Sequence, residues 1–446
     1  MKKADVIVIG GSAAGLTAAI TSRRHYPEKS VLMIRKEKEV LIPCGIPYIF
    51  GTLGSYNKNL IPDKNLASND IELLVDEVTK INRVSKKIST KNGETVAYDR
   101  LILATGSEPL SPPIPGDDKE GVFVIRKDVN HLQNMMKALD KAKNVVIIGS
   151  GFIGVELAEE CKKGRDINIK ILARSSRCLR SPYDPEFSSE AERCLKEEGI
   201  EILKEETAEE ILGDKKVTGI KLSSGKKIPV DMIIVGVGCT ANTKLAEMAG
   251  IDIGPTRGIM VNRYMKTSDP NIFACGDCAE KVSFFDGKPS KLKLASIATT
   301  EARIAASNLF NTNRMNSGVI GVYSTMLNDK AFSGAGLTEH QAKRLGYDII
   351  VGKANSPNRH PSGMKGMEPL HVKLVFEAGT KVIIGGQASG AKSVGELINT
   401  ISACILHRMT ADDIATFQTG THPGLTASPI AYQLVNAAEM AIINGK

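Results

Sequence analysis

The stretch Val145-Val-Ile-Ile-Gly-Ser-Gly-Phe-Ile-Gly154 decides the fold class of this 446-residue chain. Its four leading β-branched residues predict a buried strand, and the pattern that follows predicts a helix over residues 152–163. Between them, Gly149, Gly151 and Gly154 form the Gly-x-Gly-x-x-Gly fingerprint. These glycines allow a tight turn, close approach of the backbone to a pyrophosphate, and close packing of helix on strand. The stretch therefore predicts a Rossmann-like dinucleotide site.

The end of the next strand bears on which nucleotide binds there. The predicted strand Ile167–Leu172 is followed by Ala173-Arg-Ser-Ser-Arg177. NAD sites usually place an acid here to hold the ribose hydroxyls, whereas an arginine can pair with the 2′-phosphate of NADPH. Arg174 and Arg177 occupy this position. The sequence therefore favours NADPH over NADH, with use of both nucleotides as the alternative.

A second copy of the pattern lies at the N-terminus. The predicted strand Val6–Ile9 leads into a turn, and a helix is expected over Ala13–His25. The middle glycine of the fingerprint is replaced by a small serine. The turn residues expected to surround a pyrophosphate are Gly10, Ser12, Ala13 and Gly15.

The second predicted strand of this copy, Ser30–Ile34, also lacks the usual acid at its end. It is followed by Arg35, Lys36 and Glu37. Either Glu37 holds the ribose from a shifted position, or Arg35 and Lys36 contact phosphate or adenine. A solvated strand end is the structural alternative.

Two further motifs make the chain resemble the pyridine nucleotide–disulfide oxidoreductase superfamily. Ala104-Thr105-Gly106, before a proline-rich linker, is similar to the motif at which the chain leaves the FAD domain. Gly276-Asp277 lies in a stretch similar to the late FAD motif, whose Asp holds the ribityl chain. A metal or dithiol role for Cys275 and Cys278 is not expected, because no second Cys/His pair accompanies them.

The resemblance implies a domain organisation. It predicts an α/β protein with two Rossmann-like domains, which bind FAD and NAD(P)H, and a C-terminal α+β dimerisation domain. The FAD domain is expected to comprise residues 1–113 and 254–321, the NAD(P)H domain residues 114–253, and the dimerisation domain residues 322–446. The resemblance also implies a homodimer.

A single cysteine points to one branch of the superfamily. Pro43-Cys-Gly-Ile-Pro-Tyr48 resembles CoA-disulfide reductases, NAD(P)H-dependent persulfide and polysulfide reductases, and NADH oxidases and peroxidases. No cysteine lies five positions before or after Cys44, so a local dithiol is absent. A helix beginning after Gly45 is expected to lower the pKa of the Cys44 thiol. The resemblance implies that Cys44 lies against the flavin and attacks a sulfur of the substrate.

Three positions bear on the substrate. Oxidases and peroxidases of this branch carry a His where this chain has Ala13, which disfavours efficient peroxide or water-forming chemistry. Arg23 and Arg24 resemble arginines that meet CoA phosphates, although a solvated helix face explains them more simply. His422, followed by Pro423, resembles a base sent to the partner subunit's active site, but the downstream Glu of that motif is missing. An interface role for His422 is the alternative.

The sequence thus predicts an FAD-dependent enzyme that uses NADPH, or NADH, to reduce a small disulfide, persulfide or polysulfide. The alternatives are an oxidase that forms hydrogen peroxide, a reductase of a small electron-transfer protein, and a non-catalytic nucleotide-responsive protein. Composition disfavours nucleic acid as a partner, because the net charge of +8 is dispersed and Trp is absent. No apolar run is long enough to span a membrane and no signal peptide is evident, so a cytoplasmic location is expected.

Overall fold

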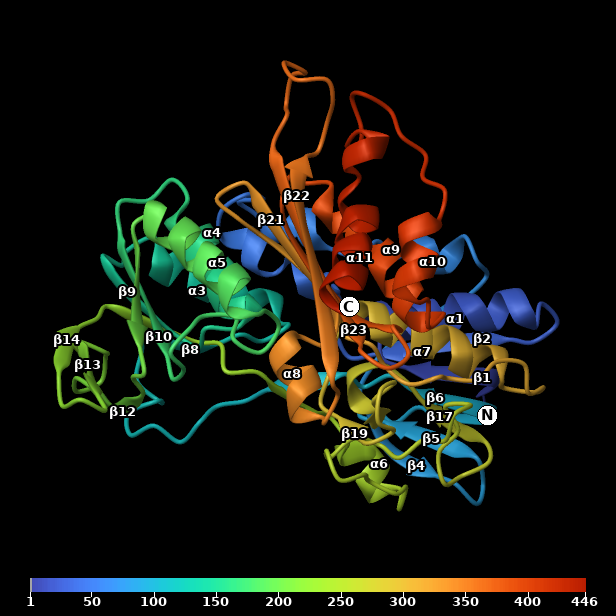
Figure 1. Ribbon diagram of the computed structural model, residues 1–446. Helices are drawn as coiled ribbons and strands as arrows, with labels where there is room; N and C mark the ends of the chain where they lie inside the picture. Colours follow the sequence, from blue (N-terminus) through green and yellow to red (C-terminus); the bar gives the residue numbers. More distant parts are fainter. Residues whose placement is uncertain (1) are drawn as a thin grey trace. The chain divides into compact units, whose positions relative to one another are not determined.

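A computed structural model describes residues 2–446, which fold into two compact units (Figure 1). The first unit comprises the chain up to Pro112 together with Phe123–Lys141 and Val237–Val319. The second comprises Pro113–Val122, Ala142–Gly236 and Ile320–Lys446. The predicted division into three domains stays a prediction.

The first unit is built on a seven-stranded sheet of order β3-β2-β1-β6-β5-β4, with β17 also pairing with β6. β1, β2, β3, β6 and β17 run parallel, whereas β4 and β5 form antiparallel pairs at one side. The strands are β1 (Lys2–Ile9), β2 (Val31–Arg35), β3 (Glu72–Val75), β4 (Val78–Asn82), β5 (Lys87–Thr90), β6 (Thr95–Leu103) and β17 (Ile272–Ala274).

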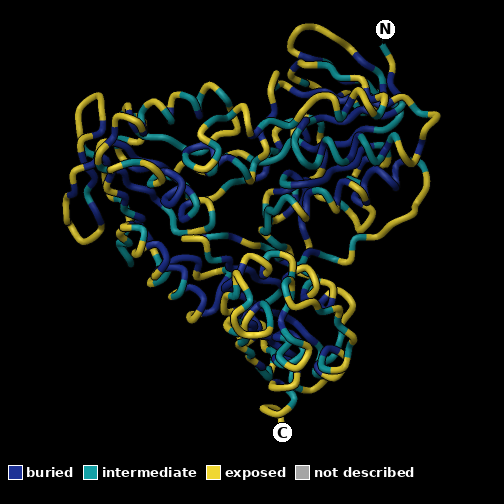
Figure 2. The backbone as a smooth tube through the Cα atoms, turned by 90° about the horizontal axis from the view of Figure 1, so that it is seen from above, coloured by how far each residue is buried: buried dark blue, intermediate teal, exposed yellow. Residues whose placement is uncertain are grey.

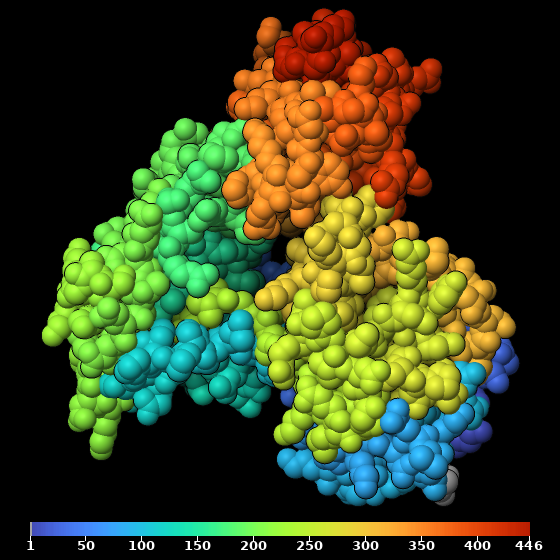
Figure 3. Space-filling model, turned by 60° about the horizontal axis from the view of Figure 1, so that its bottom comes forward, coloured from blue at the N-terminus to red at the C-terminus, as the bar shows by residue number. Residues whose placement is uncertain are grey.

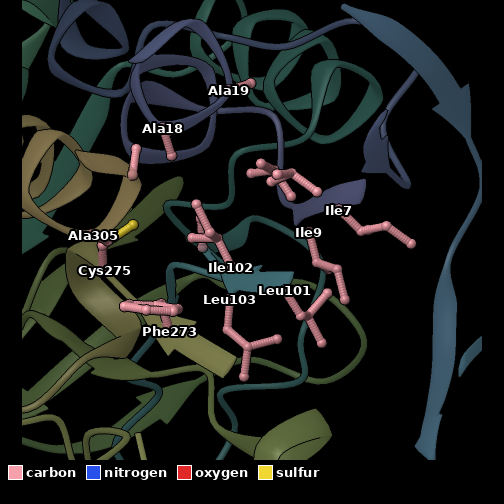
Figure 4. Close-up of a cluster of buried hydrophobic side chains, with 14 of the residues drawn as sticks. Ile7, Ile9, Ala18, Ala19, Leu101, Ile102, Leu103, Phe273, Cys275 and Ala305 are labelled. Atoms are coloured by element: carbon pink, nitrogen blue, oxygen red, sulfur yellow. The ribbon is translucent and has the colours of Figure 1, made fainter. Parts of the chain in front are cut away.

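Two helices cover this sheet and close the core of the first unit. α1 (Ala13–His25) has the predicted bounds and packs against α7 (Ala295–Ser307). The core is apolar and includes side chains of β1, β6 and β17, of which Ile102 points toward the helices and Leu101 and Leu103 point to the opposite face of the sheet (Figure 4). The unit also contains α2 (Lys64–Ala67), α3 (Val129–Leu139), α6 (Lys244–Met248), the pair β7 (Ser107–Pro109) and β16 (Cys239–Ala241), and the pair β18 (Lys281–Val282) and β19 (Pro289–Ser290).

The second unit contains a parallel sheet of order β11-β10-β9-β15. β9 and β10 are each followed by a helix, which is the predicted arrangement of a dinucleotide-binding domain. The elements are β9 (Asn144–Ile148), α4 (Phe152–Lys162), β10 (Asn168–Ala173), α5 (Pro185–Glu197), β11 (Ile200–Lys204) and β15 (Met232–Val235), with an antiparallel sheet of β12 (Ala208–Leu212), β13 (Gly219–Leu222) and β14 (Lys227–Pro229). The chain passes from the second unit to the first within β8 (Val122–Val124).

The C-terminal part of the second unit is an antiparallel sheet of order β20-β21-β24-β23-β22 with helices packed on it. A 3-10 helix, Pro429–Ala431, precedes the last helix, which begins at Gln433. The elements are β20 (Val322–Leu327), β21 (Lys330–Gly336), α8 (Glu339–Arg344), β22 (Ile349–Pro357), β23 (Pro369–Glu377), β24 (Ile383–Gly390), α9 (Val394–Leu406), α10 (Ala411–Thr416) and α11 (Gln433–Asn444).

The two parts of the second unit are joined by charged side chains. Lys373 on β23 is 2% exposed, and its Nζ lies 2.8 Å from Asp184 and 3.0 Å from Glu186, both at the start of α5. In Figure 3 the green residues of the parallel sheet and the orange residues of the C-terminal sheet lie side by side. Figure 2 shows that exposed residues concentrate in the loops.

Candidate active site

Three predicted motifs of the first unit lie at the carboxyl edge of its sheet. They are the first glycine turn, the Ala104–Gly106 motif and the Gly276-Asp277 motif. The Gly10 N–H donates to the carbonyl of Ile34, and the Ala104 N–H donates to the carbonyl of Ile9, each at 2.9 Å. The Cys275 N–H donates to the carbonyl of Leu103 at 3.0 Å. Because these strands are parallel, the turns that follow them lie together, as ligand-binding turns of open α/β sheets do.

The glycines of these turns are required by close packing. Gly10 has φ +114°, and a Cβ on it would lie 2.2 Å from the carbonyl oxygen of Ala104. A Cβ on Gly15 would lie 1.9 Å from the carbonyl oxygen of Gly10. Ser12 is the N-cap of α1, whose N-terminal N–H groups therefore face this edge. The turn has the form of a pyrophosphate cradle, and the residues present fit a dinucleotide such as FAD.

The turn that carries Asp277 lies against the same helix. Gly276 has φ +77°, and a Cβ on it would lie 2.7 Å from the Cβ of Ala14. Asp277 is partly buried, and its Oδ2 accepts a hydrogen bond from the Ser107 hydroxyl at 2.8 Å. The Nζ of Lys127 lies 4.0 Å from Asp277. Sequence reasoning missed Lys127, because it belongs to no motif and approaches Asp277 only through the fold.

The two basic residues after β2 differ in their surroundings. Arg35 is 4% exposed, and its guanidinium donates to both carboxylate oxygens of Asp63, at 2.7 and 2.9 Å. It also donates to the carbonyls of Glu37 and Lys38 at 2.9 Å. These bonds use four of its five N–H groups, so Arg35 organises the loop after β2. Lys36 is exposed, and a cofactor contact through either residue stays a prediction.

Cys44 lies on an exposed turn of the first unit. The expected helix after Gly45 is two 3-10 helices, Pro43–Gly45 and Pro47–Phe50. The turn is held by Asn59, whose Nδ2 donates to the carbonyl of Ile42 at 3.0 Å. A Cβ on Gly45 would lie 1.9 Å from the Asn59 Oδ1, so a larger residue there would displace the Asn59 side chain.

The other cysteines contrast with Cys44. Six are buried: Cys161, Cys178, Cys194, Cys275, Cys278 and Cys404. Desolvation raises the pKa of each, to about 12 for Cys161 and Cys178, so these thiols stay protonated. The sulfur of Cys275 lies among apolar side chains of the core (Figure 4). Cys239 is half-buried, and Cys44 is the exposed one of the eight.

Arg23 and Arg24 lie in the last turn of α1. Arg23 donates to the carbonyls of Pro27 and Lys29, and it lies 3.5 Å from Asp70. These contacts fix the Arg23 side chain along the loop after α1, whereas Arg24 is exposed. Their proposed contact with CoA phosphates stays a prediction.

The second glycine turn has the same close packing. Gly149 has φ +123°, and a Cβ on Gly154 would lie 2.0 Å from the carbonyl oxygen of Gly149. Gly151 is the N-cap of α4, and a Cβ on it would meet no atom within 4 Å. The turn is therefore packed tightly on the strand side and open at Gly151, as close approach of a pyrophosphate requires.

The segment of residues 174–180, called here the arginine-bearing segment, is hydrogen-bonded to the second glycine turn. The Leu179 N–H donates to the carbonyl of Ser150 at 2.9 Å. Arg174 and Arg180 are exposed, and Arg177 is half-buried with its Nε lacking a hydrogen-bond partner within residues 2–446. Sequence reasoning named Arg174 and Arg177 but missed Arg180. Arg180 follows Leu179, whose backbone hydrogen bond to Ser150 ties this part of the chain to the second glycine turn.

Helix α4 also carries a perturbed carboxyl group. Burial raises the pKa of Glu156 to about 7, and a hydrogen bond from the Thr325 hydroxyl, at 2.8 Å, opposes part of this shift. Thr325 lies on β20, so this carboxyl group joins the nucleotide helix to the C-terminal sheet.

His422 lies on an exposed loop of the C-terminal part. Its Nδ1 accepts a hydrogen bond from the Gly424 N–H at 3.2 Å. The neutral ring therefore carries its proton on Nε2, which can donate to a partner group. The His360 N–H donates to the carbonyl of Pro423 at 3.1 Å and supports this loop. Whether His422 is catalytic stays a prediction.

Comparison with known families identifies the chain. A model described as pyridine nucleotide-disulphide oxidoreductase matches residues 4–302, and a model for the dimerisation domain of the same family matches residues 322–430. The chain belongs to this family.

Individual relatives cover nearly the whole oxidoreductase. An NADH oxidase from Methanocaldococcus jannaschii is 31% identical, over 92% of this chain and 93% of that protein. An NAD(P)H sulfur oxidoreductase (CoA-dependent) from Pyrococcus furiosus is 32% identical, over 93% and 94%. Among solved structures, a NAD-dependent persulfide reductase from A. fulgidus matches with a TM-score of 0.90 and 30% identity, over 98% of this chain and 83% of that one.

A further solved structure is an engineered water-forming NADPH oxidase bound to NADPH, a variant of the Lactobacillus brevis NADH oxidase. It matches this oxidoreductase with a TM-score of 0.88 and 26% identity, over 99% of each chain. This variant carries five substitutions: a glycine changed to Ala, three consecutive residues changed to Ala, Arg and Ser, and a proline five positions further on changed to Arg.

These comparisons confirm the predicted family and the fold class, with nucleotide-binding domains followed by a C-terminal dimerisation domain. They also confirm the enzyme class, an FAD-dependent NAD(P)H oxidoreductase. None of the helices in residues 2–446 has the length and apolar character that a membrane crossing needs. Among the same residues, no three His, Cys, Asp or Glu side chains are grouped as a metal site would require.

Proposed function

We propose that this oxidoreductase uses NADPH to reduce a small disulfide, persulfide or polysulfide, CoA-linked substrates included, through Cys44. The observation that carries the proposal is the exposure of Cys44 on a turn fixed by Asn59, while six other thiols are buried with raised pKa values. A sulfur nucleophile must be accessible and able to ionise. Relatives named as a CoA-dependent sulfur oxidoreductase and a persulfide reductase support this substrate class.

The chain's own residues have three tasks in this reaction. The Cys44 thiolate attacks one sulfur of the substrate, the sulfur–sulfur bond breaks, and the departing thiolate takes a proton. Cys44 then carries the substrate sulfur as a mixed disulfide or persulfide, whose reduction needs two electrons. The turns at Gly10–Gly15 and Gly149–Gly154 hold FAD and NADPH, and Asp277 binds the ribityl chain. When bound, FAD supplies the two-electron transfer between NADPH and the sulfur on Cys44.

The arginine-bearing segment supports NADPH as the donor. This chain has Ala173, Arg174 and Ser175 in succession and Arg180 five positions further on. These residue types, at the same spacing, match four of the five substitutions in the engineered NADPH oxidase. Arg174 and Arg180 are exposed beside the second glycine turn, where a 2′-phosphate would need positive charge.

A homodimer is part of the proposal. The C-terminal part matches the dimerisation domain of the family, and it exposes large apolar side chains at Leu425 (71%) and Ile430 (88%). Burial of such side chains against a second copy is favourable. Light scattering at assay concentration is expected to give the mass of two chains, and the mass of one chain would contradict this assignment.

An anaerobic experiment tests the substrate class. The enzyme is first reduced with NADPH, and CoA disulfide, CoA persulfide, polysulfide or air is then added while the flavin absorbance is followed. Rapid reoxidation by a sulfur compound is expected in the wild type and not in Cys44→Ser, while both proteins are reduced by NADPH at similar rates. Cys239→Ser, at a half-buried cysteine, is the matched control and is expected to behave like the wild type.

Oxidation by air distinguishes the second candidate, an NAD(P)H oxidase that forms hydrogen peroxide. The relative named NADH oxidase supports this candidate. Ala13 supplies no acid–base group to the first glycine turn, and this absence disfavours the oxidase candidate. If air reoxidises the flavin faster than every sulfur compound, and Cys44→Ser retains full turnover, the sulfur-reductase proposal is wrong.

A further inference from the structure

A buried ion pair adjoins the turn that carries Asp277. The Nζ of Lys281 lies 2.8 Å from the Oε2 of Glu301, and the two side chains are 3% and 1% exposed. Lys281 is on β18 and Glu301 is on α7. Neither residue belongs to a motif that the sequence predicts, and the proposed reaction does not use them.

Both charged groups bind the same glycine. The Gly276 N–H donates to the Oε2 of Glu301 at 2.9 Å, and the Lys281 Nζ donates to the carbonyl of Gly276 at 2.6 Å. Lys281 also donates to the carbonyl of Ala279 at 3.1 Å. The peptide groups on both sides of Gly276 are therefore fixed, and Gly276 is held at φ +77°, a conformation that glycine tolerates best.

The fixed peptide determines where the next side chain points. The carbonyl that Lys281 binds belongs to the peptide group between Gly276 and Asp277. If this planar group rotated about the bonds on either side of it, the Asp277 carboxylate would move. On its other side, Asp277 accepts a hydrogen bond from Ser107 at 2.8 Å. The carboxylate is thus held between a buried charged pair and a hydroxyl group on β7.

Stability alone does not account for the pair. A buried ion pair usually adds little stability compared with apolar side chains of the same volume, because both charges lose their hydration. Desolvation raises the pKa of Glu301, and Lys281 opposes this shift. The Glu301 Oε1 is buried without a hydrogen-bond partner within residues 2–446, which is a further cost. The definite effect of the pair is the conformation that it imposes on Gly276.

We propose that Lys281 and Glu301 are positioning residues that hold Asp277 in the orientation in which it binds the ribityl hydroxyl groups of FAD. This inference rests on the proposed role of Asp277 in binding FAD. Loss of the clamp, defined as the Lys281–Glu301 pair with its bonds to Gly276, lowers FAD affinity through Asp277.

The test measures FAD affinity of the full-length protein after removal and titration of the cofactor, with thermal unfolding measured in parallel. Lys281→Met is expected to raise the Kd for FAD about tenfold or more, which is about 1.4 kcal/mol, and to shift the visible absorbance of the bound flavin. Glu301→Gln keeps an oxygen that can accept from Gly276, so a smaller increase is expected. This milder variant keeps the proposal testable if Lys281→Met does not fold.

Two comparisons separate positioning from general stability. Lys373→Met removes a lysine of equal burial, also 2.8 Å from its carboxylate, in the other unit. It is expected to lower the unfolding temperature and leave the Kd for FAD unchanged. Because Lys281 acts through Asp277, the Kd of Asp277→Ala is expected to rise little further when Lys281→Met is added.

Each remaining outcome is decisive. If Lys281→Met lowers the unfolding temperature but changes the Kd for FAD less than about twofold, or if its effect adds fully to that of Asp277→Ala, the clamp proposal is wrong. If Asp277→Ala itself leaves FAD binding unchanged, the assigned role of Asp277 fails, and the clamp fails with it.

Discussion

Replacing the two exposed arginines beside the second glycine turn tests the proposed choice of NADPH. Arg174 and Arg180 lie on the segment that the Leu179 N–H ties to Ser150. We expect Arg174→Ala combined with Arg180→Ala to lower the preference for NADPH over NADH. The 2′-phosphate is the difference between the two nucleotides, so only contacts to that group change the ratio.

The magnitude follows from the exposure of the two side chains. A hydrogen bond between charged groups contributes about 1.5–3 kcal/mol when well shielded. Exposed ion pairs are reduced by solvent to about 1 kcal/mol or less. Arg174 and Arg180 are both exposed, so together they contribute at most about 2 kcal/mol, which corresponds to a change of up to about 30-fold in the ratio of kcat/KM values.

The assay avoids any assumption about the sulfur substrate. Flavin reduction is followed in a stopped-flow instrument without oxygen, over a series of NADPH and NADH concentrations, at low and high salt. Arg193→Ala is the matched control, because Arg193 is exposed on α5 and pairs with Glu190 and Glu197 instead. A change of less than about threefold in the double variant, or an equal change in Arg193→Ala, would refute the assignment.

Three further outcomes are expected. Gly154→Ala should lower the free energy of unfolding by about 1–3 kcal/mol, because its Cβ would lie 2.0 Å from the Gly149 oxygen. Gly151→Ala, in contrast, should leave the unfolding temperature unchanged and raise the KM for the nucleotide. Lys373→Met should cost about 3–5 kcal/mol in the free energy of unfolding, because it leaves the buried Asp184 without its cation; a loss below about 1 kcal/mol would show that water reaches the pair. The pKa of Glu156 is raised to about 7 in the folded state, so its contribution to stability is fully present below about pH 4.5 and is lost as the pH rises through about 7. Urea unfolding from pH 4 to 8 should therefore show a steeper decline in the wild type than in Glu156→Gln, and parallel curves would contradict the shift.

Sequence reasoning succeeded where structure is set by neighbouring residues. Helix Ala13–His25 has its predicted bounds, and both glycine turns follow their predicted strands. The reason is local, since β-branched runs favour strands and only glycine easily adopts the positive φ seen at Gly10 and Gly149. A helix was also expected after Gly45, and the helix found there is a 3-10 helix of four residues, Pro47–Phe50.

The surroundings of the charged groups were not predictable in the same way. Nothing in the sequence signals that Asp63, 28 residues away, pairs with the guanidinium of Arg35. Lys127 reaches Asp277 across 150 residues of chain, and Glu301 reaches Gly276 from another helix. No periodicity or motif signals such pairs, because the chain forms them only when distant elements pack together.

By itself, the sequence determined that this protein has two dinucleotide-binding turns, one candidate cysteine nucleophile and an arginine-bearing strand end. These features depend on residue type and short spacing, which fix backbone conformation locally. The tertiary structure alone decided which thiol is exposed, which arginines are exposed, and which buried charges contact Gly276 in the turn that carries Asp277. Those properties depend on desolvation and on contacts between residues far apart in the chain, and both arise only when the chain is folded.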